Sequence, residues 1–388
     1  MKLRVLHVIT TLGRGGAERQ LINLVCHTPP EEYKHLVVYL HPPHDLAEEL
    51  ENAGHEVVCL DLPKRAPWLF APRRLKPILK RFQPHLIQTW LYEADFAVRL
   101  STRGLSIPVV NTLHQPAYEP ETIAAGQWPN WKMQILRQID RTTARWSKPM
   151  FIAVSETVRD SAIKQLALPK RDVRVIYNAI DVDTLRTSPD KVEKLRTELA
   201  LPTDVFFFLN VGRMAPQKGQ TFLLEAFQIV AHKFDDVYLG FAGDGPLLAE
   251  LQELSRALGI DHRVRFLGRR EDIGTCLELA NAFVFPSLFE GHPLALVEAM
   301  LKGVPCITTR IGAMEEIVSN REHAILVNPR SAAELADAMV ELRCDAGLRQ
   351  RVAEAAQKLA LERFDLRNAV TTWGALYSEV LKSRGQMS

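Results

Sequence analysis

The chain has 388 residues and an ordinary globular composition, 47% hydrophobic and 24% charged, so it is long enough to fold into two domains. Its net charge is +2, but residues 1–180 carry 24 Lys and Arg against 17 Asp and Glu, whereas residues 181–388 carry 24 against 29. This imbalance, +7 against −5, indicates different partners for the two halves, and the absence of basic runs longer than two residues argues against nucleic-acid binding.

The chain opens with M-K-L-R-V-L-H-V, which is typical of a strand rather than of a signal peptide. No uninterrupted apolar run reaches the roughly 18 residues of a membrane-spanning helix. The five cysteines are scattered and form no C-x-x-C pair, which disfavours disulfides and structural zinc. We therefore expect a cytoplasmic protein.

Strand patterns alternate with helical patterns along the chain, as in parallel α/β proteins. In the first half we expect strands at 4–9, 35–40, 56–60, 86–88, 109–113 and 151–154, and helices such as 17–27 and 46–53. In the second half we expect strands at 206–211, 237–242, 264–267, 282–285, 306–308 and 324–327, with helices clearest at 219–232 and 246–258. The polar segment 177–204 marks the seam, and a helix over 367–382 ends the chain.

Doubly wound parallel sheets bind ligands in crevices at the carboxyl ends of their strands. Two such sheets predict two Rossmann-like domains, and we expect their strand ends to face a cleft between them. The motifs described below all fall at these expected strand ends.

The segment 285–300, F-P-S-L-F-E-G-H-P-L-A-L-V-E-A-M, carries two glutamates separated by seven residues. Glu290 is expected in the loop after a buried strand, and Glu298 about two turns into the following helix, which Pro293 helps to start. Free amides at a helix start suit phosphate or sugar oxygens, and a carboxylate can accept hydrogen bonds from a ribose diol.

Three further strand-to-loop motifs carry glycines and cations. The first is G-R-G-G-A-E at 13–18, whose paired glycines let the backbone approach a ligand. The second is V-G-R-M-A-P-Q-K-G at 211–219, where Arg213 and Lys218 are spaced to converge on one phosphate. The third is F-A-G-D-G-P at 241–246, in which Asp244 is expected to act as a turn and cap residue.

This ordered set, together with Y-N-A-I-D at 177–181, resembles the retaining nucleotide-sugar glycosyltransferases of family 4, which have the two-domain GT-B fold and an E-x7-E signature. The similarity covers nearly the whole chain. It departs from the family pattern in the segment 310–316, where Ala313 replaces a glycine. The resemblance implies an acceptor-binding domain at 1–180, a donor-binding domain at 181–366, and a helix at 367–388 that crosses back to the first domain.

The resemblance also implies the site residues. Catalytic roles are expected for Glu290, His114, Arg213 and Lys218. Donor contacts are expected from these cations and Glu290, from the ribose-binding Glu298, and from Gly15, Gly16, Gly243, Gly268, Arg269, Gly291, His292, Pro293 and Leu294. His114 is expected to bind the donor sugar and not to act as a general base. We expect no cofactor and no catalytic metal, so Asp181-Val-Asp183 is interpreted as a chance D-x-D match.

Tryptophans and basic residues gather between positions 118 and 148, including Trp128, Trp131 and Trp146 with Lys132, Arg137, Arg141, Arg145 and Lys148. Aromatic and basic side chains together suit an anionic bilayer surface. The expected function is transfer of a hexosyl group from a nucleotide-diphosphate sugar to a lipid-linked or polysaccharide acceptor. The alternatives are a nucleotide-sugar epimerase of the same fold and a non-catalytic sugar-nucleotide-binding protein; a dinucleotide-dependent oxidoreductase is disfavoured by Glu18, which stands where the third fingerprint glycine is required.

Overall fold

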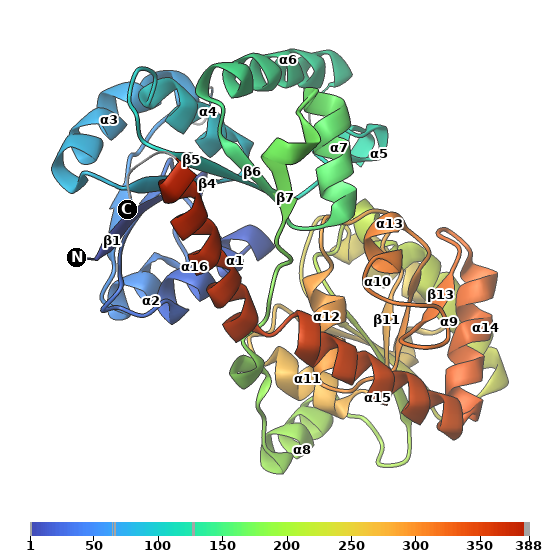
Figure 1. Cartoon of the computed structure of the whole chain (residues 1–388). Coiled ribbons are helices and arrows are strands. Elements are labelled where there is room, and N and C mark those ends of the chain that lie inside the picture. The colour runs from blue at the N-terminus through green and yellow to red at the C-terminus, as the bar shows by residue number, and fades with distance from the viewer. Residues whose placement is uncertain (1, 64, 66, 126–128, 384–388) are drawn as a thin grey trace. The chain divides into compact units, whose positions relative to one another are not determined.

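The computed structural model describes residues 2–63, 65, 67–125 and 129–383. The chain folds into two compact units (Figure 1). Unit 1 combines Met1–Ala179 with Leu366–Ser388, and unit 2 is the continuous segment Ile180–Asp365. The chain therefore leaves unit 1 once and returns to it for its last helix.

Unit 1 contains a parallel sheet of seven strands in the order β3-β2-β1-β4-β5-β6-β7 within the described residues. The strands are β1 Leu3–Ile9, β2 Tyr33–Tyr39, β3 Glu56–Cys59, β4 Leu86–Trp90, β5 Val109–Leu113, β6 Met150–Ala153 and β7 Val173–Val175. The side chains of β1 alternate between two buried layers, because successive residues of a strand point to opposite faces. Val5 and Ile9 lie in one hydrophobic cluster, and Leu6 and Val8 lie in another.

Helices cover both faces of this sheet. They are α1 Gly16–His27, α2 Ala47–Asn52, α3 Pro67–Phe82, α4 Tyr92–Ser101, α5 Pro120–Ala125, α6 Asn130–Ser147, α7 Glu156–Leu166 and α16 Leu366–Ser383. Helices α1, α2 and α16 pack on the Val5 face, whereas α3 and α4 pack on the Leu6 face. The returning helix α16 buries Trp373 and Tyr377 in the first of these clusters, and the Tyr377 hydroxyl donates to Gln88 of β4.

Unit 2 contains a six-stranded parallel sheet in the order β10-β9-β8-β11-β12-β13 in the described part of the chain. Its strands are β8 Phe206–Val211, β9 Val237–Ala242, β10 Val264–Gly268, β11 Ala282–Phe285, β12 Cys306–Thr309 and β13 Ile325–Val327. Its helices are α8 Pro189–Glu198, α9 Gln220–Lys233, α10 Leu248–Ala257, α11 Ile273–Leu279, α12 Leu294–Leu301, α13 Gly312–Glu315, α14 Ala332–Cys344 and α15 Ala346–Arg363.

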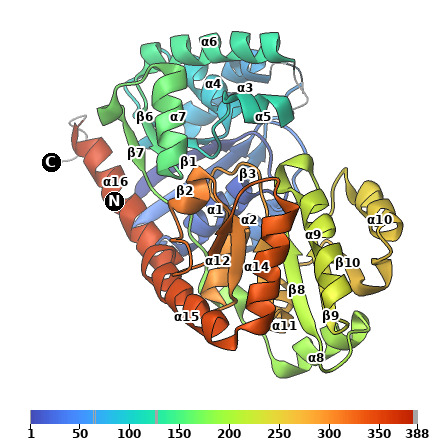
Figure 2. The ribbon, with the colours of Figure 1, turned by 90° about the vertical axis from the view of Figure 1, so that its right-hand side faces the viewer.

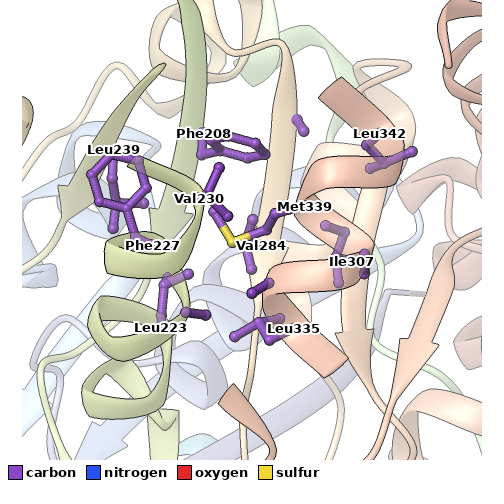
Figure 3. Close-up of a cluster of buried hydrophobic side chains, with 14 of the residues drawn as sticks. Phe208, Leu223, Phe227, Val230, Leu239, Val284, Ile307, Leu335, Met339 and Leu342 are labelled. Carbon is purple, nitrogen blue, oxygen red and sulfur yellow. The ribbon is translucent and has the colours of Figure 1, made fainter. Parts of the chain in front are cut away.

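The core of unit 2 follows from helical spacing. Helix α9 contributes Leu223, Phe227 and Val230, three apolar residues at intervals of four and three that share one helix face. Helix α14 contributes Leu335 and Met339, which are four residues apart. Both helices pack over β8, β9, β11 and β12 (Figure 3). This packing fixes the strand ends from which the motif loops emerge.

Two features of the seam segment 177–204 were not predicted. One is the ten-residue helix α8 within the segment, and the other is the short strand β7, which ends just before the segment begins. Strand β7 has only three residues, too few to show a period of two, and the strongly polar sequence of α8 hides its single buried apolar residue, Leu195. Glu298 is the fifth residue of α12, so it lies little more than one turn into that helix rather than two.

Candidate active site

The strand order of unit 2 reverses direction between β8 and β11, which are hydrogen-bonded neighbours. Ligands of open α/β sheets bind at such switch points, beyond the carboxyl ends of the strands. The loop after β8 carries Gly212–Gly219, and the loop after β11 carries Glu290. Two of the sequence motifs, 72 residues apart, therefore meet at the position that the topology favours for a ligand.

The Lys218 ammonium lies 2.5 Å from Glu290 Oε1 and joins these two loops. The Lys218 side chain is 19% exposed and that of Glu290 is 8% exposed, so the pair is largely removed from water. The ammonium also lies 5.0 Å from the centre of the Phe285 ring. An ammonium has three N–H donors, so Lys218 can hold Glu290 and still donate to an anionic ligand.

Gln217 fixes the spacing between the same loops. The side-chain amide of Gln217 donates to the Phe289 carbonyl at 2.8 Å, and the backbone carbonyl of Gln217 accepts from the Leu288 amide at 2.8 Å. Gly219 has a φ of +65°, and a Cβ there would lie 2.2 Å from the Pro286 carbonyl oxygen. Only glycine fits this conformation and this contact, so the loops are held together by backbone as well as by the ion pair.

The glycines of 241–246 serve close backbone packing. A Cβ on Gly243 would lie 2.0 Å from the Gly212 carbonyl oxygen, and one on Gly245 would lie 2.4 Å from that of Met214. Asp244 accepts from the Gly245 amide at 2.7 Å, as expected for a turn residue. The Gly243 amide donates to the Gly268 carbonyl at 2.8 Å, which ties the ends of β9 and β10 together.

The predicted site cations Arg213 and Arg269 differ from the neighbouring Arg270. Arg213 and Arg269 are exposed at strand ends, where their guanidinium groups can reach a ligand. Arg270 instead forms two 2.8 Å hydrogen bonds with Asp272 and one of 2.5 Å with Glu198. These bonds raise the pKa of Arg270 and give it a structural role.

The residues around the start of α12 lie close together but differ in exposure. Gly291, His292 and Pro293 are buried, and the His292 ring packs edge-on against Phe364 with ring centres 5.4 Å apart. The Leu294 amide donates to the His292 carbonyl at 3.1 Å, so that amide is engaged within the loop. Glu298 is partly exposed on α12.

In unit 1 the strand order reverses between β1 and β4, and the loop after β1 carries the motif at 13–18. Gly15 caps α1 and Gly16 is its first residue. The Glu18 side chain folds back over this helix start, where a Cβ on Gly15 would lie 2.3 Å from Glu18 Oε2. Thr11 Oγ1 donates to Glu18 at 3.1 Å, and burial raises the pKa of Glu18. The paired glycines were expected to let the backbone approach a ligand, and the Glu18 carboxylate lies against Gly15 in the same turn.

His114 follows β5 and stacks on Trp90 with ring centres 5.4 Å apart. Burial lowers the pKa of His114 to about 3, so the imidazole is neutral at pH 7. Its Nε2 atom has no hydrogen-bond partner among the described residues, and the side chain lines a cavity of about 50 Å³ with Asp95, Tyr118 and Asp140. A neutral imidazole with an unused nitrogen can donate to or accept from a hydroxyl, depending on its tautomer.

Three residues that line this cavity, Asp95, Tyr118 and Asp140, belong to a buried polar network that the sequence did not reveal. Arg99 NH1 lies 2.5 Å from Asp140 Oδ1, and its Nε and NH2 donate to Asn111 at 2.9 and 2.7 Å. Tyr118 donates to the other oxygen of Asp140 at 2.9 Å. Asp95 lies near both Arg99 and Asp140, and burial raises the pKa of Asp95 to about 7. The residues are spread over β5, α4 and α6, so no local motif signals the network.

The D-x-D match has a local structural use. Asp181 Oδ1 accepts from the Asp183 amide at 3.0 Å, and Asp183 pairs with Arg186 at 2.7 Å. Among residues 2–63, 65, 67–125 and 129–383, no group of three or more His, Cys, Asp or Glu side chains could hold a metal ion. Over the same residues, no helix has both the length and the apolar character needed to cross a bilayer.

Comparison with known proteins identifies the two halves. A family model described as Glycosyltransferase Family 4 matches residues 14–184, and one described as Glycosyl transferases group 1 matches residues 191–359. The chain is 29% identical to a phosphatidyl-myo-inositol mannosyltransferase of Mycobacterium leprae, over 76% of this chain and 75% of the relative. It is 26% identical to an Escherichia coli UDP-Gal:alpha-D-GlcNAc-diphosphoundecaprenol alpha-1,3-galactosyltransferase, over 70% and 69%.

Solved structures agree. Anabaena HepE in complex with UDP-glucose superposes with a TM-score of 0.83 and 25% identity, over 98% of this chain and all of HepE. WaaG, a glycosyltransferase involved in lipopolysaccharide biosynthesis, has a TM-score of 0.75 over 96% of this chain and, at 15% identity, supports the fold alone. The GT-B fold expected from the sequence is confirmed. The chain belongs to glycosyltransferase family 4, a retaining family, and is an enzyme that transfers a sugar from a nucleotide-sugar donor.

Proposed function

We propose that the β8–β11 edge of unit 2 binds the nucleoside diphosphate of the donor. The observation that carries this proposal is the Lys218–Glu290 pair across the switch point, at 2.5 Å. Lys218 and the exposed Arg213 supply positive charge. The absence of a side chain on Gly243 lets its backbone pack directly against the Gly212 carbonyl oxygen. A diphosphate leaving group gains charge in the transition state, and preorganised cations stabilise that charge.

The other donor roles follow from position. Glu298, partly exposed on α12, accepts from the ribose hydroxyls, and Glu290 orients the transferred sugar. Gly268, Arg269 and the loop at 291–294 surround the base and phosphates. Because HepE was crystallised with UDP-glucose, a uridine nucleotide is the first donor class to test.

We propose that unit 1 holds the acceptor, and that Gly15, Gly16 and His114 at its strand ends contact the donor. The neutral His114 hydrogen-bonds a sugar hydroxyl and does not remove its proton, because its pKa of about 3 makes it a poor base. Retention then proceeds by front-face attack, with the departing phosphate taking the acceptor proton. No metal is required, since Arg213 and Lys218 carry the leaving-group charge.

A lipid-linked acceptor is supported by the E. coli relative, whose name specifies a diphosphoundecaprenol substrate. The outer face of α6 supports membrane contact. Trp131, Ile135 and Trp146 on this helix are 66%, 52% and 57% exposed, and their spacing of four and eleven residues places them on one stripe. Helix α6 lies outside α4 and α5 (Figure 2).

The charge of α6 suits an anionic surface. Lys132, Arg137, Arg141 and Arg145 are its cations, and its one acidic residue, Asp140, is buried against Arg99. Amphipathic helices with exposed tryptophan and flanking cations lie in the bilayer interface. The Trp128 named with this group from the sequence lies outside the described residues. We therefore propose a cytoplasmic enzyme held peripherally at the membrane.

Calorimetry with UDP, GDP and ADP tests the donor half of this proposal. The protein should bind one of them, and Lys218→Ala should weaken that binding. Equal binding by the variant would exclude the switch point as the phosphate site.

Vesicle flotation tests the membrane half. Trp131→Ser with Trp146→Ser should abolish association with anionic vesicles at low salt, whereas Ile229→Ser, which removes an apolar side chain 39% exposed in unit 2, should not. Association should weaken as salt rises, because screening shortens electrostatic reach to about 8 Å at physiological ionic strength. Failure of the unaltered protein to float would indicate a soluble acceptor.

A further inference from the structure

A second pocket lies at the edge of the unit 1 sheet opposite to the motif loops. It has a volume of about 490 Å³ and is formed where β5, β6 and β7 begin. Pro108 and Met150 stand at the starts of β5 and β6, and the last turn of α16 contributes Val380 and Ser383. Because His114 and the glycine motif follow the carboxyl ends of the strands, this pocket is separate from the candidate active site.

Three cations and one carboxylate line the pocket. Arg145 and Lys148 come from the end of α6, Arg171 comes from the turn before β7, and Asp172 is the single acid, which gives a formal charge of +2. Asp172 lies 3.8 Å from Arg171, and the nearby Glu379 of α16 is held by Arg174 at 2.6 Å. The charge balance of the pocket therefore favours an anionic ligand.

The rest of the lining is mainly apolar. Pro108, Met150, Leu168 and Val380 contribute hydrocarbon surface beside the cations. Arg145 also adjoins Trp146, the last residue of the exposed apolar stripe on α6. A ligand that fits must combine a negative charge with an apolar portion, and the pocket adjoins the helix that we place in the bilayer interface.

We propose that this pocket binds the phosphate head group of an anionic lipid, with Arg145, Lys148 and Arg171 holding the phosphate and the apolar wall covering the first carbons of the lipid. This inference rests on the proposed membrane contact in one respect, which is that the membrane would supply the lipid. Lipid binding here would fix the enzyme on its membrane by a specific site in addition to diffuse charge.

Calorimetry on the full chain with dihexanoyl phosphatidylglycerol, below its micelle concentration, tests the site without a membrane. The double variant R145Q/R171Q should bind this lipid roughly 30-fold more weakly, since each cation near an anionic lipid is worth about one kcal/mol. Lys148 is left unchanged, so the double variant tests the two guanidinium groups alone. The matched control, R73Q/K76Q, removes two exposed cations from α3 of the same unit and should bind as the parent does.

Three outcomes would overturn the proposal. Equal binding of dihexanoyl phosphatidylcholine would show that the negative charge is not recognised. Equal binding of inorganic phosphate would indicate a site for free anions, and equal losses in R73Q/K76Q would indicate diffuse surface charge. Nucleoside diphosphate binding by R145Q/R171Q should stay at the parental level, so failure of this inference is distinguishable from failure of the proposed donor site.

Discussion

The switch point of unit 2 and that of unit 1 have the same strand arrangement but are surrounded by different titratable groups. At the β8–β11 edge, Lys218 forms an ion pair with Glu290, and Arg213 is exposed. Close to the β1–β4 edge, burial lowers the pKa of His114 to about 3 and raises that of Asp95 to about 7, and the nearby Arg99–Asp140 ion pair is itself buried. We therefore propose that one topology serves a charged diphosphate in one unit and neutral hydroxyls in the other.

The contrast extends into the core of unit 1. Trp90 Nε1 donates to His7 Nδ1 at 3.4 Å, His7 Nε2 lies 2.9 Å from His35 Nδ1, and His35 Nε2 lies 2.7 Å from Thr28 Oγ1. Since the indole can only donate, each histidine must carry its proton on Nε2. The Thr28 hydroxyl, which accepts from His35, donates in turn to the Val25 carbonyl at 3.0 Å. A second proton on either ring would place two N–H groups face to face.

Loss of charge in unit 2 should have the largest effect. Lys218→Ala should reduce transfer by about 2–4 kcal/mol in transition-state free energy, because the leaving diphosphate loses a preorganised cation. The control is Lys302→Ala, which breaks a 2.5 Å pair with Glu278 and has a lysine 17% exposed, at the far end of α12. Steady-state kinetics on both variants decides the matter; similar losses would mean that any part-buried ion pair of unit 2 matters equally.

Acid should destabilise unit 1 through its neutral histidines. Burial and the neighbouring His55 lower the pKa of His35 to about 3. Below pH 6.5 the unfolded chain binds a proton that the folded chain does not, so stability falls as pH falls, by about 2 kcal/mol at pH 5 for this one group. All six tryptophans lie in segments of unit 1, so tryptophan fluorescence during urea unfolding follows that unit.

The control for this prediction is His35→Asn, which cannot titrate. Asp95 acts in the opposite direction, because its raised pKa makes the folded chain bind a proton below about pH 7 that the unfolded chain releases. Asp95 is present in both proteins, so its contribution cancels when their slopes between pH 6.5 and pH 5 are compared. The variant should have the shallower slope, and parallel slopes would refute the neutral state of His35.

The sequence predicted the strands that carry the motifs better than the contacts between motifs. The strands over 109–113, 206–211 and 282–285 have the predicted limits, because each is rich in apolar and β-branched residues and is followed by a polar or turn residue, His114, Gly212 or Pro286. The Lys218–Glu290 pair joins positions 72 residues apart, and the approach of the Glu18 carboxylate to Gly15 is not visible in the glycine spacing. Such contacts depend on tertiary geometry, to which local spacing gives no access.

The two glutamates of 285–300 should respond differently. Glu298→Gln should weaken nucleoside diphosphate binding by about tenfold, because its proposed partner is the ribose. Glu290→Gln should affect nucleotide binding less and reduce turnover with the full donor. Calorimetry on both variants separates the roles, and equal losses of nucleotide affinity would refute the assignment.

Removal of metal should have the smallest effect. Asp181 and Asp183 are engaged in a turn and with Arg186, and the leaving-group charge is assigned to Arg213 and Lys218. EDTA should therefore leave the transfer rate nearly unchanged. A large loss that manganese restores would make the metal part of the reaction and return Asp181 and Asp183 to the list of candidate ligands. It would also weaken the contrast between the units, since the fixed cations of unit 2 would then neutralise only part of the diphosphate charge.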